Sequence, residues 1–227
     1  MITQNSAQIY LADKRKQRQT SGYHCWSTLG FDNYQDEANK AFGSLFLFNY
    51  QILAPDQNTT VVTQADCIYY ILPLYGGVQL EKESENNKLI LSQKIEQLVC
   101  KQETPFQISN PFSENVSYVI IGFISKTNNL KRQLISFDFQ EKNKLTTIFE
   151  NEIANIFVGN FDGRKEAVYH LKSKQNGIFA YIIQGAFEFE NRLLETGDAL
   201  SIKNIDSVEW EALSQNAMLL LIEIPFT

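Results

Sequence analysis

Short apolar runs, separated by polar turn residues, recur along the whole chain. No long segment shows the i, i+3, i+4 apolar spacing of an amphipathic helix. Many short strands at regular spacing are typical of a β-sandwich or β-barrel, so the pattern predicts an all-β fold. The clearest runs are Leu45–Ile52, Cys67–Leu74, Lys88–Leu91, Ile95–Cys100, Val116–Ile124, Leu134–Phe139, Ile153–Val158, Ala167–Leu171, Ile178–Ile183, Ala186–Phe189, Ala199–Ile202 and Ala217–Ile224.

Two of these runs indicate how their strands are covered. Phe187 and Phe189 alternate with Glu188 and Glu190, which predicts one buried and one solvated face. The run Ala217–Ile222 is apolar throughout, so we expect both of its faces to be covered.

The polar stretch from Ser125 to Arg132 lacks periodicity and divides the runs into two groups. It predicts two domains, an N-terminal barrel over residues 1–127 and a C-terminal barrel over residues 128–227. A strand, a glycine turn and a second short strand occur in Ile68–Leu80 and again in Phe179–Phe189. This internal echo is consistent with a duplicated barrel.

Composition narrows the classes of function. The chain has 227 residues, among them 16 Phe and 10 Tyr, and aromatic side chains favour half-buried sheets. The net charge is −6, whereas a nucleic-acid binder usually has a basic excess on one face. The basic cluster Lys14, Arg15, Lys16 and Arg18 has no aromatic stacking motif beside it. We therefore expect it to be solvated, and we expect no nucleic-acid partner.

The sequence also predicts a compartment. Met1 to Gln19 is polar and has no apolar h-region, and no window approaches the ~20 apolar residues of a membrane helix. We therefore predict no signal peptide and no membrane partner. Cys25, Cys67 and Cys100 are an odd number at wide spacing, which is not a disulfide framework. We therefore expect free thiols, which are typical of proteins in the reducing cytoplasm, and we predict a cytoplasmic protein.

Motifs in both halves resemble the pirin family of cupins. A basic segment, a Phe-Gly-x-Leu strand and an Asn-Pro pair resemble the pirin N-terminal domain, and a strand, a glycine, a hairpin and a Gly-Asp turn resemble its C-terminal cupin domain. The resemblance spans nearly the whole chain and implies a bicupin, with two tandem cupin-type barrels of the jelly-roll kind. The motifs are Ala12–Arg15, Phe42–Leu45, Asn110-Pro111, Gly177–Gly185, Phe187–Phe189 and Leu194–Leu200.

The resemblance implies a metal centre that this sequence does not supply. Pirins hold iron or a related metal in the N-terminal barrel on a His-x-His and a later His-x-Glu motif, with an open position for substrate or oxygen. Aligned with Tyr70–Leu72 and Asn110-Pro111, the four ligand positions fall at Thr60, Val62, Phe106 and Ile108. The two histidines of this chain are His24 and His170. We therefore predict no metal, no other cofactor and no catalytic residue, and a pocket at those four positions and Asp66.

Other residues could supply chemistry in place of the histidines. Asp66, Cys67, Cys100 and Glu103 could rebuild a metal site, although their spacing matches no recognised zinc motif. A His24–Cys25 dyad is disfavoured because sequence neighbours in an extended segment face opposite sides. We expect His170 to be packed or hydrogen-bonded, and Trp26 and Trp210 to be core or domain-interface residues.

Three functions remain open. We favour a non-catalytic binding protein for a small molecule or a protein partner. The alternative is an atypical pirin-like dioxygenase, of the quercetinase type, that uses the rebuilt metal site. A third is a structural subunit that associates through exposed sheet edges, so the chain could be a monomer or a homodimer.

Overall fold

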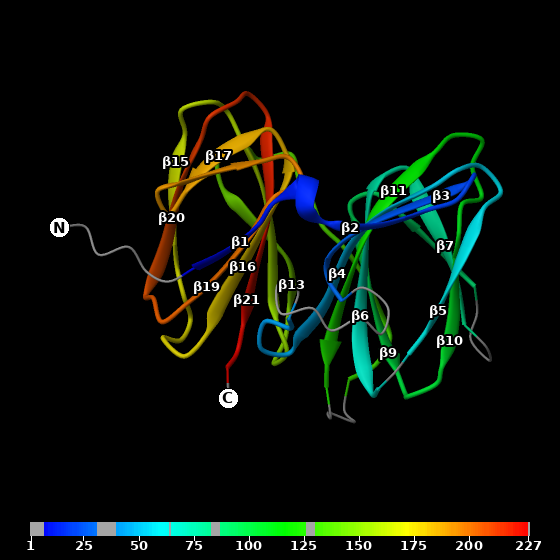
Figure 1. The fold of residues 1–227 in the computed structure, drawn as a ribbon. Helices are drawn as coiled ribbons and strands as arrows, with labels where there is room; N and C mark the ends of the chain where they lie inside the picture. The colour runs from blue at the N-terminus through cyan, green and yellow to red at the C-terminus, as the bar shows by residue number, and fades with distance from the viewer. Residues whose placement is uncertain (1–6, 31–39, 64, 83–86, 126–129, 227) are drawn as a thin grey trace. The chain divides into compact units, whose positions relative to one another are not determined.

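The computed structural model describes residues 7–30, 40–63, 65–82, 87–125 and 130–226. The chain forms two compact units (Figure 1). The N-terminal unit comprises Lys16–Ala41 and Leu45–Ser136, and the C-terminal unit comprises Met1–Arg15, Phe42–Ser44 and Phe137–Thr227. Strands dominate both units, and the described residues include one short 3₁₀ helix, η1 (Ala12–Lys14). The prediction of an all-β fold is confirmed.

The N-terminal unit consists of a larger and a smaller sheet with a hydrophobic core between them. The larger sheet has the order β12-β9-β6-β11-β4-β3-β2, and the smaller has the order β5-β10-β7-β8. Leu53, Ile71, Leu98 and Ile120 from the larger sheet pack in this core with Val78 and Ile108 from the smaller. The strands are β2 (Lys16–Gln19), β3 (Tyr23–Leu29), β4 (Leu45–Leu53), β5 (Asn58–Val62), β6 (Cys67–Tyr75), β7 (Gly77–Lys82), β8 (Lys88–Leu91), β9 (Lys94–Cys100), β10 (Pro105–Ser109), β11 (Val116–Ile124) and β12 (Gln133–Ser136).

The C-terminal unit repeats this plan. Its larger sheet has the order β1-β19-β16-β21-β14-β13, and its smaller sheet has the order β15-β20-β17-β18. Phe161, Phe187, Phe189 and Trp210 form an aromatic centre of its core. The strands are β1 (Ala7–Tyr10), β13 (Leu145–Glu150), β14 (Asn155–Phe161), β15 (Glu166–His170), β16 (Gly177–Gln184), β17 (Ala186–Phe189), β18 (Arg192–Glu195), β19 (Ala199–Lys203), β20 (Ser207–Ala212) and β21 (Ala217–Ile224).

The two units are topological copies of one another. Strands β5, β10, β7 and β8 correspond in order to β15, β20, β17 and β18, and β9-β6-β11-β4 corresponds to β19-β16-β21-β14. Gly76 links β6 to β7 with φ +73°, and Gly185 links β16 to β17 with φ +81°. A side chain is strained at such angles, so glycine fits both hairpin turns. The echo between the two halves of the sequence therefore reflects a repeated strand order.

The predicted burial of β17 and β21 is also confirmed. Phe187 and Phe189 are fully buried while Glu188 is exposed. In β21, Met218 is half-buried and every other residue is buried. Strand β21 lies between β16 and β14, in the middle of its sheet, which explains why its sequence is apolar on both faces.

The N-terminal segment completes the C-terminal unit, which differs from the predicted division into residues 1–127 and 128–227. Strand β1 pairs with β19, the Ala12 N–H donates to Asp198 Oδ1 at 2.7 Å, and Arg15 Nη1 donates to Tyr181 Oη at 3.4 Å. Conversely, β12 pairs with β9 in the N-terminal unit. Strands β1 and β12 are both edge strands, and each belongs to the unit whose sheet it extends. The predicted boundary itself, between residues 127 and 128, lies outside the described residues.

Candidate functional site

The inner face of the smaller N-terminal sheet is where the sequence predicted a pocket. Strands β5 and β10 pair so that Val61 opposes Phe106 and Thr59 opposes Ile108. Phe106 and Ile108 are buried in the core, and Val61 packs against it.

Thr60 and Val62, by contrast, do not lie on this inner face. Both are exposed, and Val62 retains 58% of its accessible surface. A one-residue difference in register moves a side chain to the opposite face of a strand, so the inward neighbours Thr59 and Val61 take their place.

The inward-facing set does not fit the metal centre that the resemblance implies. Thr59, Val61, Phe106 and Ile108 offer one hydroxyl and three hydrocarbon side chains, whereas that centre needs three imidazoles and a carboxylate. Phe106 packs on the ring of Tyr69, with ring centroids 5.2 Å apart. Throughout the described residues, no group of three or more His, Cys, Asp or Glu side chains is arranged to hold a metal ion.

The four residues proposed to rebuild a metal site do not converge. Cys67 and Cys100 are buried on the inner face of the larger sheet. Asp66 is half-exposed and is ion-paired to Lys101, with 2.9 Å between Oδ2 and Nζ, and Glu103 is exposed. The ion pair lowers the pKa of Asp66. The carboxylates thus face solvent while the thiols face the core.

A cluster of buried polar side chains on β3, β4 and β11 was not predicted. Tyr118 Oη donates to Gln51 Oε1 at 2.5 Å, and Tyr23 is hydrogen-bonded to Cys25 and Thr59. Burial raises the pKa of Tyr23, Tyr118 and Cys25. These groups bond to one another, as buried polar groups must. A polar residue within an otherwise apolar run could have indicated this cluster, and Gln51 in β4 is such a residue.

The histidines lie away from both inner cores. His24 stacks on Trp26 with ring centroids 3.4 Å apart, and Cys25 between them points inward. The expectation that His24 and Cys25 face opposite sides is confirmed. His170 was expected to be packed or hydrogen-bonded. It is exposed on the outer face of β15 with Val168, so the first of these two alternatives, a packed side chain, is wrong. Trp210 is a core residue as predicted, whereas Trp26 is half-buried on β3.

A buried carboxylate lies inside the C-terminal unit. Glu223 Oε1 accepts from the Lys172 N–H at 2.8 Å and from Asn176 Nδ2 at 2.6 Å, and Glu223 Oε2 accepts from Tyr169 Oη. Burial and the neighbouring Glu223 raise the pKa of Tyr169. Three donors satisfy this carboxylate. Two of them, Lys172 and Asn176, lie in the connection between β15 and β16, so Glu223 holds this connection against β21.

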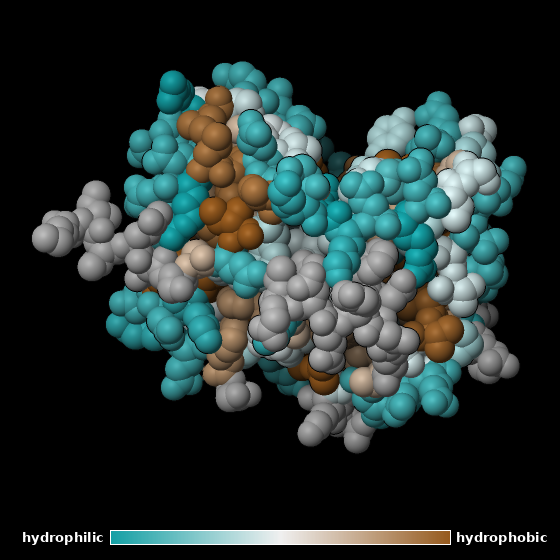
Figure 2. All heavy atoms as spheres, viewed as in Figure 1, coloured by the Kyte–Doolittle hydropathy of each residue, from teal (hydrophilic) through white to brown (hydrophobic). Residues whose placement is uncertain are grey.

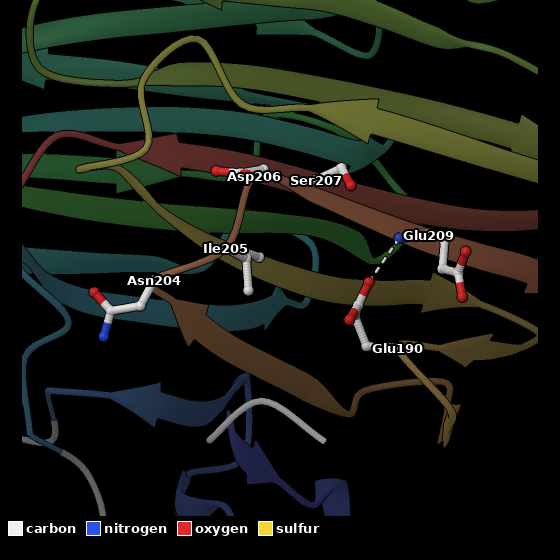
Figure 3. Close-up of a pocket in the computed structure, with 6 residues that line it drawn as sticks. All are labelled: Glu190, Asn204, Ile205, Asp206, Ser207 and Glu209. Carbon is white, nitrogen blue, oxygen red and sulfur yellow. Dashed lines mark hydrogen bonds between the residues drawn. The ribbon is translucent and has the colours of Figure 1, made fainter. Parts of the chain in front are cut away.

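The C-terminal unit also has a surface depression of about 440 Å³ (Figure 3). Its lining comes from the turn after β17, the connection between β19 and β20, and β20 itself: Glu190, Asn204, Ile205, Asp206, Ser207 and Glu209. The Glu209 N–H donates to Glu190 Oε1 at 2.8 Å, which holds two walls of the depression together. Asp206 is ion-paired to the exposed Lys174. The carboxylates give the depression a negative potential, which disfavours anionic ligands.

The acidic character continues over the outer face of the smaller C-terminal sheet. Glu211 is the cross-strand partner of Glu166 on one side and of Glu188 on the other. Arg164 Nη1 lies 3.2 Å from Glu211 Oε1. Like charges directly opposite each other oppose sheet formation, so this row is a local destabilising feature.

Hydrophilic residues cover most of the face of each unit seen in Figure 2. A short hydrophobic strip lies over the C-terminal unit. The exposed large apolar residues of that unit are Ile9, Leu11, Val168, Leu193 and Leu213. Among the residues that the structure describes, no helix has the length and apolar character needed to cross a membrane.

Known proteins share this fold at low sequence identity. Residues 140–224 match the family model of the quercetinase C-terminal cupin domain. No curated protein sequence matches the chain.

Three solved structures illustrate the likeness. YhhW from Escherichia coli has a TM-score of 0.84 at 14% identity, covering 98% of this chain and 99% of its own. The bacterial pirin YhhW in complex with nickel(II), also from Escherichia coli, has a TM-score of 0.81 at 16% identity, with coverage of 98% and 100%. Quercetin 2,3-dioxygenase from Acinetobacter baumannii has a TM-score of 0.76 at 12% identity, with coverage of 96% and 85%.

Proposed function

Because the chain has the fold of bacterial pirins and the inner face of β5 and β10 carries no imidazole, we propose that it is a non-catalytic binding protein without a metal centre. The observation behind the proposal is the inward-facing set on β5 and β10. Thr59, Val61, Phe106 and Ile108 occupy the inner face where the resemblance places metal ligands, and the last two are fully buried among apolar neighbours. Such an interior favours packing over coordination.

The proposal separates this chain from two of its structural neighbours. One neighbour was solved with nickel(II), and another is named a quercetin 2,3-dioxygenase. A dioxygenase with a bound metal needs donors that hold the ion and an open position for substrate. The polar side chains described around the mainly apolar N-terminal core include phenols, thiols and an amide, which pair as Tyr118 with Gln51, Tyr23 with Cys25 and Tyr69 with Cys67. We therefore propose that the barrel is retained as a scaffold for recognition of a partner or small molecule.

Elemental analysis tests whether the protein lacks a metal centre. Protein purified without an affinity tag is incubated in turn with iron, manganese, nickel, copper and zinc and then desalted. We expect far less than one equivalent of each metal, and no oxygen uptake when quercetin is added. Near-stoichiometric metal together with oxygen uptake would overturn the proposal.

A gain-of-metal variant tests the structural argument. Thr59→His, Val61→His, Phe106→His and Ile108→Glu combined place four donors on the inner face, and we expect this variant to retain nickel or iron. The matched control keeps Phe106→His and Ile108→Glu but carries Thr60→His and Val62→His instead of the substitutions at positions 59 and 61. In the control two imidazoles face solvent, so we expect little metal retention. Equal retention by both variants would contradict the assignment of the inner face.

A further inference from the structure

Two cysteines oppose each other inside the N-terminal unit. Cys67 begins β6 and Cys100 ends β9, and the two are Cα partners in this antiparallel ladder. Both belong to the core cluster, and their exposed fractions are 2% and 1%. Their side chains therefore extend from adjacent strands into the same interior space.

This register meets the geometric requirement of a disulfide bond. Directly opposed residues of antiparallel strands have Cα atoms about 4.5 or about 5.5 Å apart. Disulfides span Cα separations of about 4.4 to about 6.8 Å, so either kind of pair falls within the range. Cys25 is excluded as a partner because β11 and β4 lie between its strand, β3, and β6.

Two features keep the pair reduced while the barrel is closed. Burial raises the pKa of the Cys67 thiol to about 11, so little of the reactive thiolate exists at neutral pH. Tyr69 is hydrogen-bonded to Cys67 and interacts with Cys100, and its ring packs on Phe106. Oxidation therefore requires local opening.

The opening is expected at the end of the barrel where both cysteines lie. Strand ends open more easily than strand centres. Asp66 and Lys101 flank the cysteines and join the two strand ends through an ion pair of 2.9 Å, and Asp66 Oδ1 also accepts from the Gln102 N–H at 3.0 Å. Since these contacts are exposed to water, they can break without disturbing the core.

We propose that Cys67 and Cys100 form a site of reversible oxidative modification, which closes to an intramolecular disulfide when a hydroperoxide reaches the open strand ends. One thiol releases its proton, the resulting thiolate attacks an oxygen of hydrogen peroxide, and the O–O bond breaks. A sulfenic acid and hydroxide form, and the hydroxide takes up the released proton to give water. The second thiol attacks that sulfur, the S–S bond forms, the S–O bond breaks, and a second water leaves. Two thiols are oxidised by two electrons in total and one hydrogen peroxide is reduced to two waters.

Thiol counting on the full-length protein tests the site. The protein is treated with hydrogen peroxide, denatured, alkylated without reductant and examined by intact mass and peptide mapping. We expect the number of alkylated cysteines to fall from three to one, with the Cys67 and Cys100 peptides linked and Cys25 alkylated. Dithiothreitol should restore all three thiols. Three alkylated cysteines after oxidation, or a linkage that includes Cys25 or a second chain, would overturn the proposal.

Variants test the pairing and the entry route separately. Cys67→Ala and Cys100→Ala should each abolish the intramolecular disulfide, whereas the matched Cys25→Ala control should close as the wild type does. Asp66→Asn removes the ion pair and should speed closure several-fold. Equal rates for Asp66→Asn and wild type would refute the entry route at the strand ends. Because the mapping on the wild-type chain needs no variant, poor folding of a cysteine variant leaves the test decisive.

Discussion

Several side chains of the N-terminal unit have a pKa that burial raises, which links their ionisation to the stability of the fold. The Cys67 thiol has a pKa raised from 9.0 to about 11, chiefly because burial penalises its charged form. Burial likewise raises the pKa of Tyr69 and Tyr23. Each of these groups must give up its proton more easily in the unfolded chain than in the folded one. Stability and ionisation are therefore linked at these residues.

We predict that the free energy of unfolding falls as the pH rises from about 9 to about 11. Below about pH 9 the Cys67 thiol is protonated in both states, so it contributes no pH dependence. Between the two values only the unfolded chain loses this proton, which stabilises the unfolded state. Urea unfolding at intervals of pH measures the slope, and Cys67→Ala should make it shallower. Identical slopes for the variant and the wild type would refute the assignment to this thiol.

At the scale of elements, the smaller C-terminal sheet combines a well-packed inner face with an unfavourable outer one. Its inner face contributes Phe187, Phe189 and Trp210 to the core. Its outer face aligns Glu166, Glu211 and Glu188 across three adjacent strands. The burial of aromatic rings outweighs the repulsion among exposed carboxylates, since each buried ring contributes far more than a surface charge pair.

We predict that Glu188→Lys stabilises the protein by about 0.2–1 kcal/mol, because it replaces a like-charged cross-strand pair with an oppositely charged one. The matched control is Glu195→Lys, which makes the same change of charge at a position whose partner is Ala186. We expect little change in the control. Thermal unfolding at low and high salt measures the difference, which should shrink as salt screens the pair. A stabilisation of equal size in both variants would mean that net charge, rather than the row, is responsible.

At the scale of the whole molecule, an edge strand distant in sequence completes the C-terminal sheet. Strand β1 covers the edge of β19, and Tyr10 Oη lies 3.2 Å from Ser201 Oγ. Asp198 accepts from the Ala12 N–H and, through Oδ2, from the Glu195 N–H at 2.9 Å. Residues close to the start of the chain therefore belong to the folding unit at its end.

We predict that removal of residues 1–15 lowers the melting temperature and promotes association, because it leaves the edge of β19 unpaired. Differential scanning calorimetry and light scattering measure the two effects. Tyr10→Phe, which removes one hydroxyl and keeps the strand, is the control and should cost only about 1 kcal/mol. A truncated chain that melts at the wild-type temperature would show that β1 is dispensable.

The strands that could be predicted from the sequence are those with a clear run of apolar residues. The predicted runs Lys88–Leu91, Val116–Ile124, Ala186–Phe189 and Ala217–Ile224 have the same bounds as β8, β11, β17 and β21. Strands β2 and β5 were not predicted. Their sequences, Lys-Gln-Arg-Gln and Asn-Thr-Thr-Val-Val, gain their structure from pairing with a neighbouring strand at a sheet edge.

Strand periodicity and composition are local properties, so the all-β class, the repeated barrel and the lack of histidine between Cys25 and Tyr169 could be read from the amino-acid sequence alone. The pairing of the folded strands was needed to show that Thr59 and Val61, rather than Thr60 and Val62, face the core. The same pairing shows that Cys67 opposes Cys100 and that β1 joins the C-terminal unit. Each of these depends on the register between strands distant in the sequence, and a shift of one residue reverses every side chain on a strand.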